Sequence, residues 1–240
     1  MRRTRFYPLI GLAVAALIGA PVLSGGSVMA QVAPTASEAA AYTGLHAAAQ
    51  KGDVAKIEKL AAATKADHNA RDSNGRTPLH VATFAKQRDA IRALVKAGAD
   101  INLLDKDRYD CVTIASVADD EETLRVLLTL GASAKLITSR YDGTALIAAA
   151  HLGHDGVVKQ LIAAGAPLDH VNNLHWTAAI ESVVLGNGGE RHQETLRALI
   201  KAGANLQLTD RQGNTPLQLA TTRGYAEMVR MLSVSAPTVK

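Results

Sequence analysis

Cysteine and aromatic residues are scarce in this 240-residue chain, which has one cysteine, one tryptophan, five tyrosines and two phenylalanines. A lone cysteine cannot form an internal disulfide, so packing must stabilise the fold. We expect Cys111 to be a packed thiol, because no activating partner for it is evident in the sequence. The alternative is a thiol whose pKa is lowered by the start of a helix.

A surplus of one charge is also absent outside the first 30 residues. The chain has 26 lysines and arginines against 22 aspartates and glutamates, and residues 1–30 contain three of the arginines and no acidic residue. The remainder therefore carries 23 basic and 22 acidic residues, without a long basic run. This balance disfavours nucleic acid or an anionic membrane as the partner.

An apolar run marks residues 1–30. Basic residues at positions 2, 3 and 5 precede a run from Leu9 to Leu23, and small residues precede Gln31. This order predicts a secretory signal peptide that is cleaved before Gln31, and hence a periplasmic protein, with secretion from the cell as the alternative. An uncleaved anchor is disfavoured, because the run is shorter than the roughly 20 residues that a spanning helix needs.

The rest of the chain contains a repeat. Gly75 to Ala82 read Gly-Arg-Thr-Pro-Leu-His-Val-Ala, and Gly98 to Asn102 read Gly-Ala-Asp-Ile-Asn. The first phrase suits the start of a helix, with a capping threonine and a proline in the first turn, and Gly98 suits the end of one. The Thr77 position recurs at intervals of 34, 33, 34, 33 and 38 residues, at Thr43, Thr77, Asp110, Thr144, Thr177 and Thr215.

Apolar residues recur at fixed offsets from this origin. Two residues after it the chain is apolar in every unit, and five residues after it the side chain is always small. Allowing five inserted residues in the fifth unit, offsets of fourteen and seventeen give Ile57 and Leu60, Ile91 and Leu94, Leu124 and Leu127, Val158 and Leu161, Leu196 and Leu199, and Val229 and Leu232. This stripe predicts one core running through six stacked helix pairs.

These phrases and their period resemble the ankyrin repeat, whose pattern runs Gly-x-Thr-Pro-Leu-His-x-Ala-Ala, a second helix and Gly-Ala-Asp-x-Asn over about 33 residues. The resemblance implies an all-α solenoid of about six helix-turn-helix units joined by short β-hairpin fingers. It also implies that His46 and His80 are structural, each bonding to the backbone of the adjoining hairpin. The expected function is non-enzymatic and cofactor-free: binding of a protein partner on the concave face of fingers and inner helices.

The predicted domain boundaries follow from the repeat. We expect residues 31–41 to be a flexible leader that turns helical from Ser37, residues 42–234 to be the repeat domain, and residues 235–240 to be a frayed tail. The first unit ends without the usual glycine, which suits a terminal unit with one neighbour. The expected protein is a monomer without a membrane span after cleavage.

The fifth unit is five residues longer than the others, and the surplus falls in Gly186 to His192, between its two helices. Such loops on one face of a solenoid often bind a partner, and a permissive surface insertion is the alternative. A metal-dependent or hydrolytic site could be assembled in this unit from His175, Glu181, Glu190 and His192. No nucleophile with a base and an orienting group is visible, so we predict no catalytic residue and no metal.

Two further clusters have structural explanations. Asp119 to Glu122 precede a helix, where acidic residues favour its positive end, so capping is preferred to calcium binding. His151 and His154 lie three residues apart and Asp155 follows. The Gly-His pair at 153–154 fits the turn of the repeat better than a zinc site with two imidazoles.

The scarce aromatic residues indicate where a partner binds. Tyr109, Tyr141 and Trp176 fall in the fingers of three consecutive units, where large rings add little to a core but contribute strongly to interfaces. Packing of Trp176 against the inserted loop or a neighbouring finger is the alternative. Finger charges such as Asp107 and Arg108 would select the partner, and an effector that acts on host proteins is a further possibility. The predicted partner-binding residues are Arg76, Tyr109, Arg140, Tyr141, His175, Trp176, Glu190, Arg191 and His192.

Overall fold

The computed structural model describes residues 31–63 and 66–234, so the predicted signal peptide and the predicted tail lie outside the described residues. Within them the chain forms thirteen helices and no strand, which confirms the all-helical class. Every helix in this described part is too short or too polar to cross a membrane. The helices are α1 (Ala36–Ala41), α2 (Gly44–Lys51), α3 (Val54–Ala61), α4 (Pro78–Phe84), α5 (Arg88–Lys96), α6 (Cys111–Val117), α7 (Glu121–Thr129), α8 (Ala145–Leu152), α9 (Asp155–Ala163), α10 (Ala178–Val184), α11 (Glu190–Lys201), α12 (Pro216–Thr222) and α13 (Ala226–Val234).

The first helix of each unit begins where the repeat predicts. In the second unit the Thr77 hydroxyl accepts a hydrogen bond from the His80 amide, and Pro78 occupies the first turn. Thr43, in the terminal unit, makes no such bond. The recurring residue is therefore the N-cap of the first helix in every unit, and from the second unit onward its oxygen satisfies an amide that the helix leaves unpaired. The other caps are Asp110, Thr144, Thr177 and Thr215.

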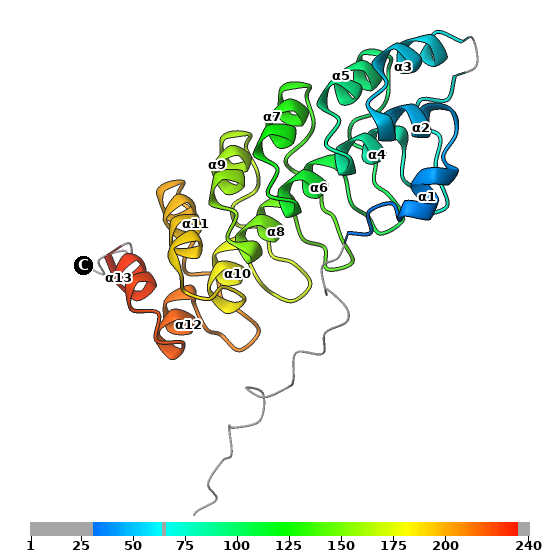
Figure 1. The fold of residues 1–240 in the computed structure, drawn as a ribbon. Helices are drawn as coiled ribbons and strands as arrows, with labels where there is room; N and C mark the ends of the chain where they lie inside the picture. The colour runs from blue at the N-terminus through cyan, green and yellow to red at the C-terminus, as the bar shows by residue number, and fades with distance from the viewer. Residues whose placement is uncertain (1–30, 64–65, 235–240) are drawn as a thin grey trace, which may run out of the picture. The chain divides into compact units, whose positions relative to one another are not determined.

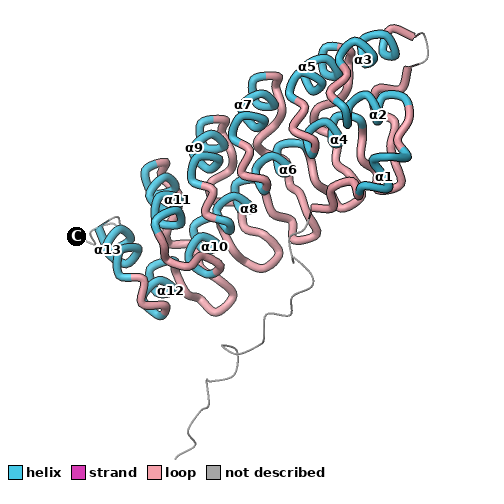
Figure 2. The backbone as a smooth tube through the Cα atoms, viewed as in Figure 1, coloured by secondary structure: helices cyan, strands magenta, loops and turns pink. Residues whose placement is uncertain are grey.

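From Ala33 onward the described residues form one compact unit, in which the helices pack in two layers that follow chain order (Figure 1). In the inner layer α2, α4, α6, α8, α10 and α12 pack successively, and in the outer layer α3, α5, α7, α9, α11 and α13 do the same. Each repeat unit thus contacts its neighbours in sequence, as expected of a solenoid. Loops between units extend from the edge of the inner layer, as Figure 2 shows.

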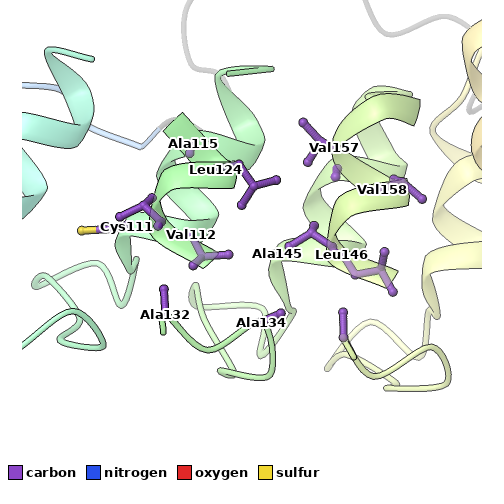
Figure 3. Packing of buried hydrophobic residues seen from close by; sticks show 14 of the residues in the cluster. Cys111, Val112, Ala115, Leu124, Ala132, Ala134, Ala145, Leu146, Val157 and Val158 are labelled. Carbon is purple, nitrogen blue, oxygen red and sulfur yellow. The ribbon is translucent and has the colours of Figure 1, made fainter. Parts of the chain in front are cut away.

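The core lies between the two layers. Val112 and Leu124 of the third unit, and Leu146 and Val158 of the fourth, have no exposed surface (0%) and stand at predicted offsets (Figure 3). The predicted apolar stripe is therefore confirmed in the second to sixth units, whereas Leu60 of the first unit is half-buried and outside the core cluster. Cys111 belongs to the same cluster, and burial raises the pKa of its thiol to about 12, which confirms a packed thiol.

The segments between units, which we call the fingers, are tight loops rather than paired strands. They comprise residues 72–76, 105–109, 138–143, 172–176 and 210–214, and lead into the second to sixth units. A backbone hydrogen bond of 2.8–3.0 Å joins the first and last residue of each. In the described residues the only β pairing is an isolated bridge between Thr138 and Gly143. The predicted β-hairpins reduce to loops, because each finger is too short to pair more than one residue on either side.

Residues 36–41 form the short helix α1, close to the start predicted at Ser37. Glu38 completes a capping box at its start. The same carboxylate accepts hydrogen bonds from Asn74 Nδ2 at 2.7 Å and from Arg76 Nη2 at 3.0 Å. The leader is therefore held against the second-unit finger.

Candidate binding surface

Most fingers begin with an acidic or amide residue that fixes the loop from inside. The Asp72 carboxylate accepts hydrogen bonds from the amides of Asn74 and Arg76, both at 2.8 Å. In the fourth-unit finger Ser139 takes over, and its hydroxyl accepts from the Tyr141 amide at 3.2 Å. The loop amides are thus satisfied within the finger. Amides two and four residues on are accepted in the same way, at 2.8–3.0 Å, by Asp105, Asn172 and Asp210.

Successive fingers are also bonded to one another. The Lys106 amide donates to the Asn74 carbonyl at 3.0 Å, and the Asn173 amide donates to the Tyr141 carbonyl at 2.9 Å. A third bond of 2.9 Å joins the amide of residue 139 to the carbonyl of residue 108. The fingers of the second to fifth units therefore form one continuous, preorganised edge, which needs little ordering when a partner binds.

Arg76, a predicted partner-binding residue, is buried, with 0% of its surface exposed. Its guanidinium lies 2.7 Å from Asp72 and 3.0 Å from Glu38. Burial alone would raise the pKa of Asp72, but hydrogen bonds from Tyr42 and Arg76 outweigh it and lower that pKa. A partner cannot reach the Arg76 side chain, and the prediction is corrected: the charge of this residue is compensated inside the fold.

Tyr109, a second predicted contact, is also buried, with 7% of its surface exposed, and burial raises the pKa of its hydroxyl. Its placement on the partner-facing surface is corrected as well. Its backbone carbonyl accepts a hydrogen bond from His80 Nε2 at 3.1 Å, and His46 Nε2 lies 3.0 Å from the Arg76 carbonyl. These two bonds confirm the structural role predicted for both histidines.

The remaining finger residues do reach the surface. Arg140 is exposed, Tyr141 is half-buried, and the guanidinium lies 5.7 Å from the centre of the tyrosine ring. His175 is exposed and has a left-handed backbone (φ 66°). Trp176 is half-buried, and its amide is bound within its own finger by Asn172. These four predicted contacts lie in adjacent fingers that are bonded to each other.

Sequence reasoning missed several exposed apolar side chains beside these residues. Ile137 and Val171 stand immediately before two fingers, with 46% and 40% of their surfaces exposed, and Leu174 at a finger tip has 36% exposed. Leu185, with 42% exposed, lies at the other end of α10, next to the inserted loop. The available signal was their place in the repeat: they lie outside the offsets that build the core, so their large apolar side chains are not explained by packing.

Glu181 is buried beneath this surface and is fully engaged. Its two carboxylate oxygens lie 2.9 Å from Asn172 Nδ2 and 3.0 Å from His151 Nδ1. The carboxylate therefore ties α10 to α8 and to the fifth-unit finger. It is 2% exposed, and its hydrogen-bond partners are Asn172 and His151 rather than Glu190 or His192, two of the other candidates for a catalytic site.

The inserted loop is separated from the fingers. The fifth-unit finger precedes α10 and the insertion follows it, so the helix stands between them. Arg191 contacts Asp119 at 2.8 Å and Asp155 at 3.5 Å, and His192 Nε2 lies 3.0 Å from the His151 carbonyl. Glu190 is the exposed first residue of α11. These three predicted contacts thus lie along the turns between helices, not with Tyr141 and Trp176.

The clusters considered as metal sites have other partners. Asp120 caps α7 by accepting from the Thr123 amide at 3.1 Å, as expected for a capping cluster, and pairs with Arg88 at 3.1 Å. His154 Nδ1 lies 2.9 Å from the Ser116 carbonyl. Over residues 31–63 and 66–234, no three histidine, cysteine or acidic side chains are placed to hold a metal ion together.

Known proteins resemble this chain over most of its length. Residues 31–105 and 112–210 match a profile described as ankyrin repeats (3 copies), and residues 189–232 match one described as ankyrin repeats (many copies). The ankyrin repeat protein YahD of Escherichia coli (strain K12) is 36% identical over 186 residues, which cover 77% of this chain and 92% of YahD.

Solved structures give the same result. The crystal structure of an ankyrin repeat domain from Acinetobacter baumannii AYE is 44% identical, with a TM-score of 0.75, over 80% of this chain and 96% of that chain. A chain in the structure of the predatory endopeptidase Bd0816 from Bdellovibrio bacteriovorus in complex with immunity protein Bd3460 is 26% identical. Its TM-score is 0.62, and the match covers 80% of this chain and 98% of that chain.

Proposed function

This chain belongs to the ankyrin repeat family, and from that premise we propose that it binds a protein partner through the fingers and adjoining inner helices of its fourth and fifth units. Ankyrin repeat domains typically mediate protein–protein interaction and are generally not enzymes. The family does not select the partner or the surface, because one fold serves many partners. Both must be argued from this chain.

The observation that carries the proposal is the distribution of exposed apolar side chains. Of the six large apolar residues that are exposed in the described part of the chain, three lie at the fourth- and fifth-unit fingers: Ile137, Val171 and Leu174. A fourth, Leu185, lies at the opposite end of α10. Tyr141 and Trp176 lie in the same two fingers. Apolar surface gathered on a preorganised edge, outside the core, is typical of an interaction site.

We further propose that the protein acts in the periplasm as a monomeric scaffold or chaperone-like binder. The order of basic, apolar and small residues in positions 1–30 supports export. The Bdellovibrio structure is a complex of two proteins, which supports a protein as the partner class. Fractionation of the producing cell tests the location, and recovery of the chain only in the medium would favour a secreted effector instead.

Affinity capture from a periplasmic extract tests the surface. The bait is the chain from Gln31 onward, compared with the Tyr141→Ala, Trp176→Ala double variant and with Val234→Ala. Val234 is 83% exposed at the end of α13, so this control removes an exposed apolar side chain away from the fingers. Each buried ring contributes about 2 kcal/mol at an interface, so the double variant should bind at least about a hundredfold more weakly.

The parent and the Val234→Ala control should recover the same partner. Circular dichroism must show that all three forms remain folded. Equal capture by the folded double variant would refute this surface.

A further inference from the structure

The exposed charges of the fingers are mostly positive. We call the fingers together with the residue before each one the finger region. Its exposed acidic residue is Asp107, and the half-buried Asp142 lies 2.7 Å from Arg108 in an ion pair. The exposed basic side chains of this region are Arg71, Lys106, Arg108, Arg140 and Arg211.

The sign of this surface follows from how the fingers are built. Asp72, Asp105 and Asp210 direct their carboxylates to the loop amides, as described above, and are largely buried. The acidic residues of the fingers are thus occupied inside the loops, whereas the basic residues stand outside. Counting charged residues in the sequence gives nearly neutral fingers, but the outer surface of the fingers is basic because most of their acidic side chains are buried.

Four of the five exposed cations have no carboxylate partner in the described residues. Arg211 donates to the Asn173 carbonyl and Lys106 to the Ser73 carbonyl, which are neutral acceptors. Arg71 donates to the carbonyls of residues 75 and 104. Arg140 lies over the Tyr141 ring. Each can gain an ion pair from a partner without losing one in the fold.

Cations also flank the apolar finger residues. The Arg140 carbonyl accepts a hydrogen bond from Asn173 Nδ2 at 2.9 Å, and Arg211 donates to the carbonyl of the same Asn173. The fifth-unit finger, which carries Leu174 and Trp176, therefore lies between the fingers of Arg140 and Arg211. Across three consecutive fingers the surface therefore presents the cation of Arg140, the apolar residues of the fifth-unit finger and the cation of Arg211.

We infer that the partner presents an acidic segment to this edge, with carboxylates on either side of an apolar side chain. The inference rests on the proposed function and specifies its partner class. A protein segment fits better than a nucleic acid, because residues 31–240 carry only one more basic than acidic residue and the exposed groups include the aliphatic Leu174, Val171 and Ile137. Nucleic acid binding normally requires a stronger basic surface.

The test selects a displayed library of random short peptides on the chain from Gln31 onward. Two charge-matched variants are compared: Arg140→Glu with Arg211→Glu, and Arg125→Glu with Lys56→Glu. Arg125 and Lys56 are exposed on the outer layer and have no ion pair in the described residues. Selected peptides are then titrated by fluorescence, for which Trp176 is the single tryptophan of the chain.

Peptides selected on the parent should be enriched in aspartate and glutamate beside leucine or an aromatic residue. They should bind about fivefold to tenfold more weakly to the finger variant, as expected for two exposed ion pairs, and equally well to the outer-layer variant. If the double variant does not fold, Arg140→Glu alone serves, because it leaves every finger hydrogen bond in place.

Four results would overturn the inference. Peptides without acidic enrichment, or equal losses in both variants, would refute the acidic class while the partner captured through Tyr141 and Trp176 still supported the binding surface. Selection of no peptide would refute a linear acidic segment. Tighter binding of a single-stranded oligonucleotide, lost in the finger variant, would assign the surface to nucleic acid.

Discussion

The parent should lose stability as the pH falls from the unfolded-state histidine pKa to about 5, and replacing His80 with glutamine should remove most of this pH dependence. The imidazole is buried, its Nδ1 lies 3.1 Å from the Thr77 amide nitrogen, and its Nε2 lies 3.1 Å from the Tyr109 carbonyl. Since a backbone amide can only donate, Nδ1 must accept and carries no proton in the folded state. Protonation of Nδ1 would bury a positive charge and would place its N–H against the N–H of Thr77, so that two donors face each other.

The expected size follows from the pKa shift. Burial lowers the pKa of His80 from 6.5 to about 4. Between these values the unfolded chain binds a proton that the folded chain does not, so stability is complete above pH 6.5 and is lost as the pH falls toward 4. Each pH unit corresponds to about 1.4 kcal/mol, so the loss is about 2 kcal/mol by about pH 5 and about 3 kcal/mol in total.

Glutamine is a suitable replacement because the sixth unit already contains it. Gln218 occupies the position of His80 there, and its Oε1 accepts from the Thr215 amide at 2.8 Å. The capping interaction is therefore kept while the titrating group is removed. His46→Gln is the matched control: it removes a histidine from the same slot of the first unit and should retain the pH dependence, since His80 remains.

Urea unfolding followed by circular dichroism at a series of pH values measures the effect. The comparison must be made between variants, because burial raises the pKa of Asp105 and Asp110, whose folded states gain stability as the pH falls. Subtracting the variants cancels these contributions. Parallel pH profiles for the parent and His80→Gln would refute the assignment of a neutral, buried imidazole.

Three further predictions concern the core and its buried polar groups. Leu124→Ala, at a position with 0% exposure, should lower the free energy of unfolding in urea by about 2–5 kcal/mol, and a loss below about 1 kcal/mol would contradict the packed core. Glu181→Ala should cost about 2 kcal/mol in the same assay, because it leaves Asn172 and His151 without their carboxylate, and Glu181→Gln should cost less. Cys111 should react slowly with a thiol reagent in the native protein and rapidly in urea, because burial raises its pKa to about 12; rapid native labelling would show an accessible thiol.

The repeat could be predicted from the sequence because each unit uses the same local interactions. In the second unit Thr77 caps a helix, Leu79 packs in the core and His80 bonds to the next finger. Related residues do the same at these offsets in other units. The helical spacing of apolar residues indicates which face of a helix is buried, and the repeat period indicates which helices of neighbouring units pack together. Both are properties of residues close in sequence or one unit apart, so they leave a readable pattern.

The surface could be predicted only in part, because exposure at a finger position depends on what covers it. Arg76, Tyr109 and Trp176 share one slot of the repeat, yet the first two are buried and the third is half-buried. Arg76 is covered by Glu38 of α1, a residue outside the repeat, and no offset predicts that contact. The ion pair between Arg191 and Asp119 likewise joins residues 72 positions apart. Such contacts do not recur at the repeat period, so they cannot be predicted from the repeat in a single sequence.

The finger design separates stability from recognition. The first residue of most fingers and the backbone amides satisfy each other, so the loop conformation does not depend on the tip side chains. Substitutions at Arg140 or Leu174 can therefore change what binds without changing how the stack folds. Because the edge is already ordered, little of the binding free energy is spent on fixing loops, and the chemistry of the tips decides which partner is held.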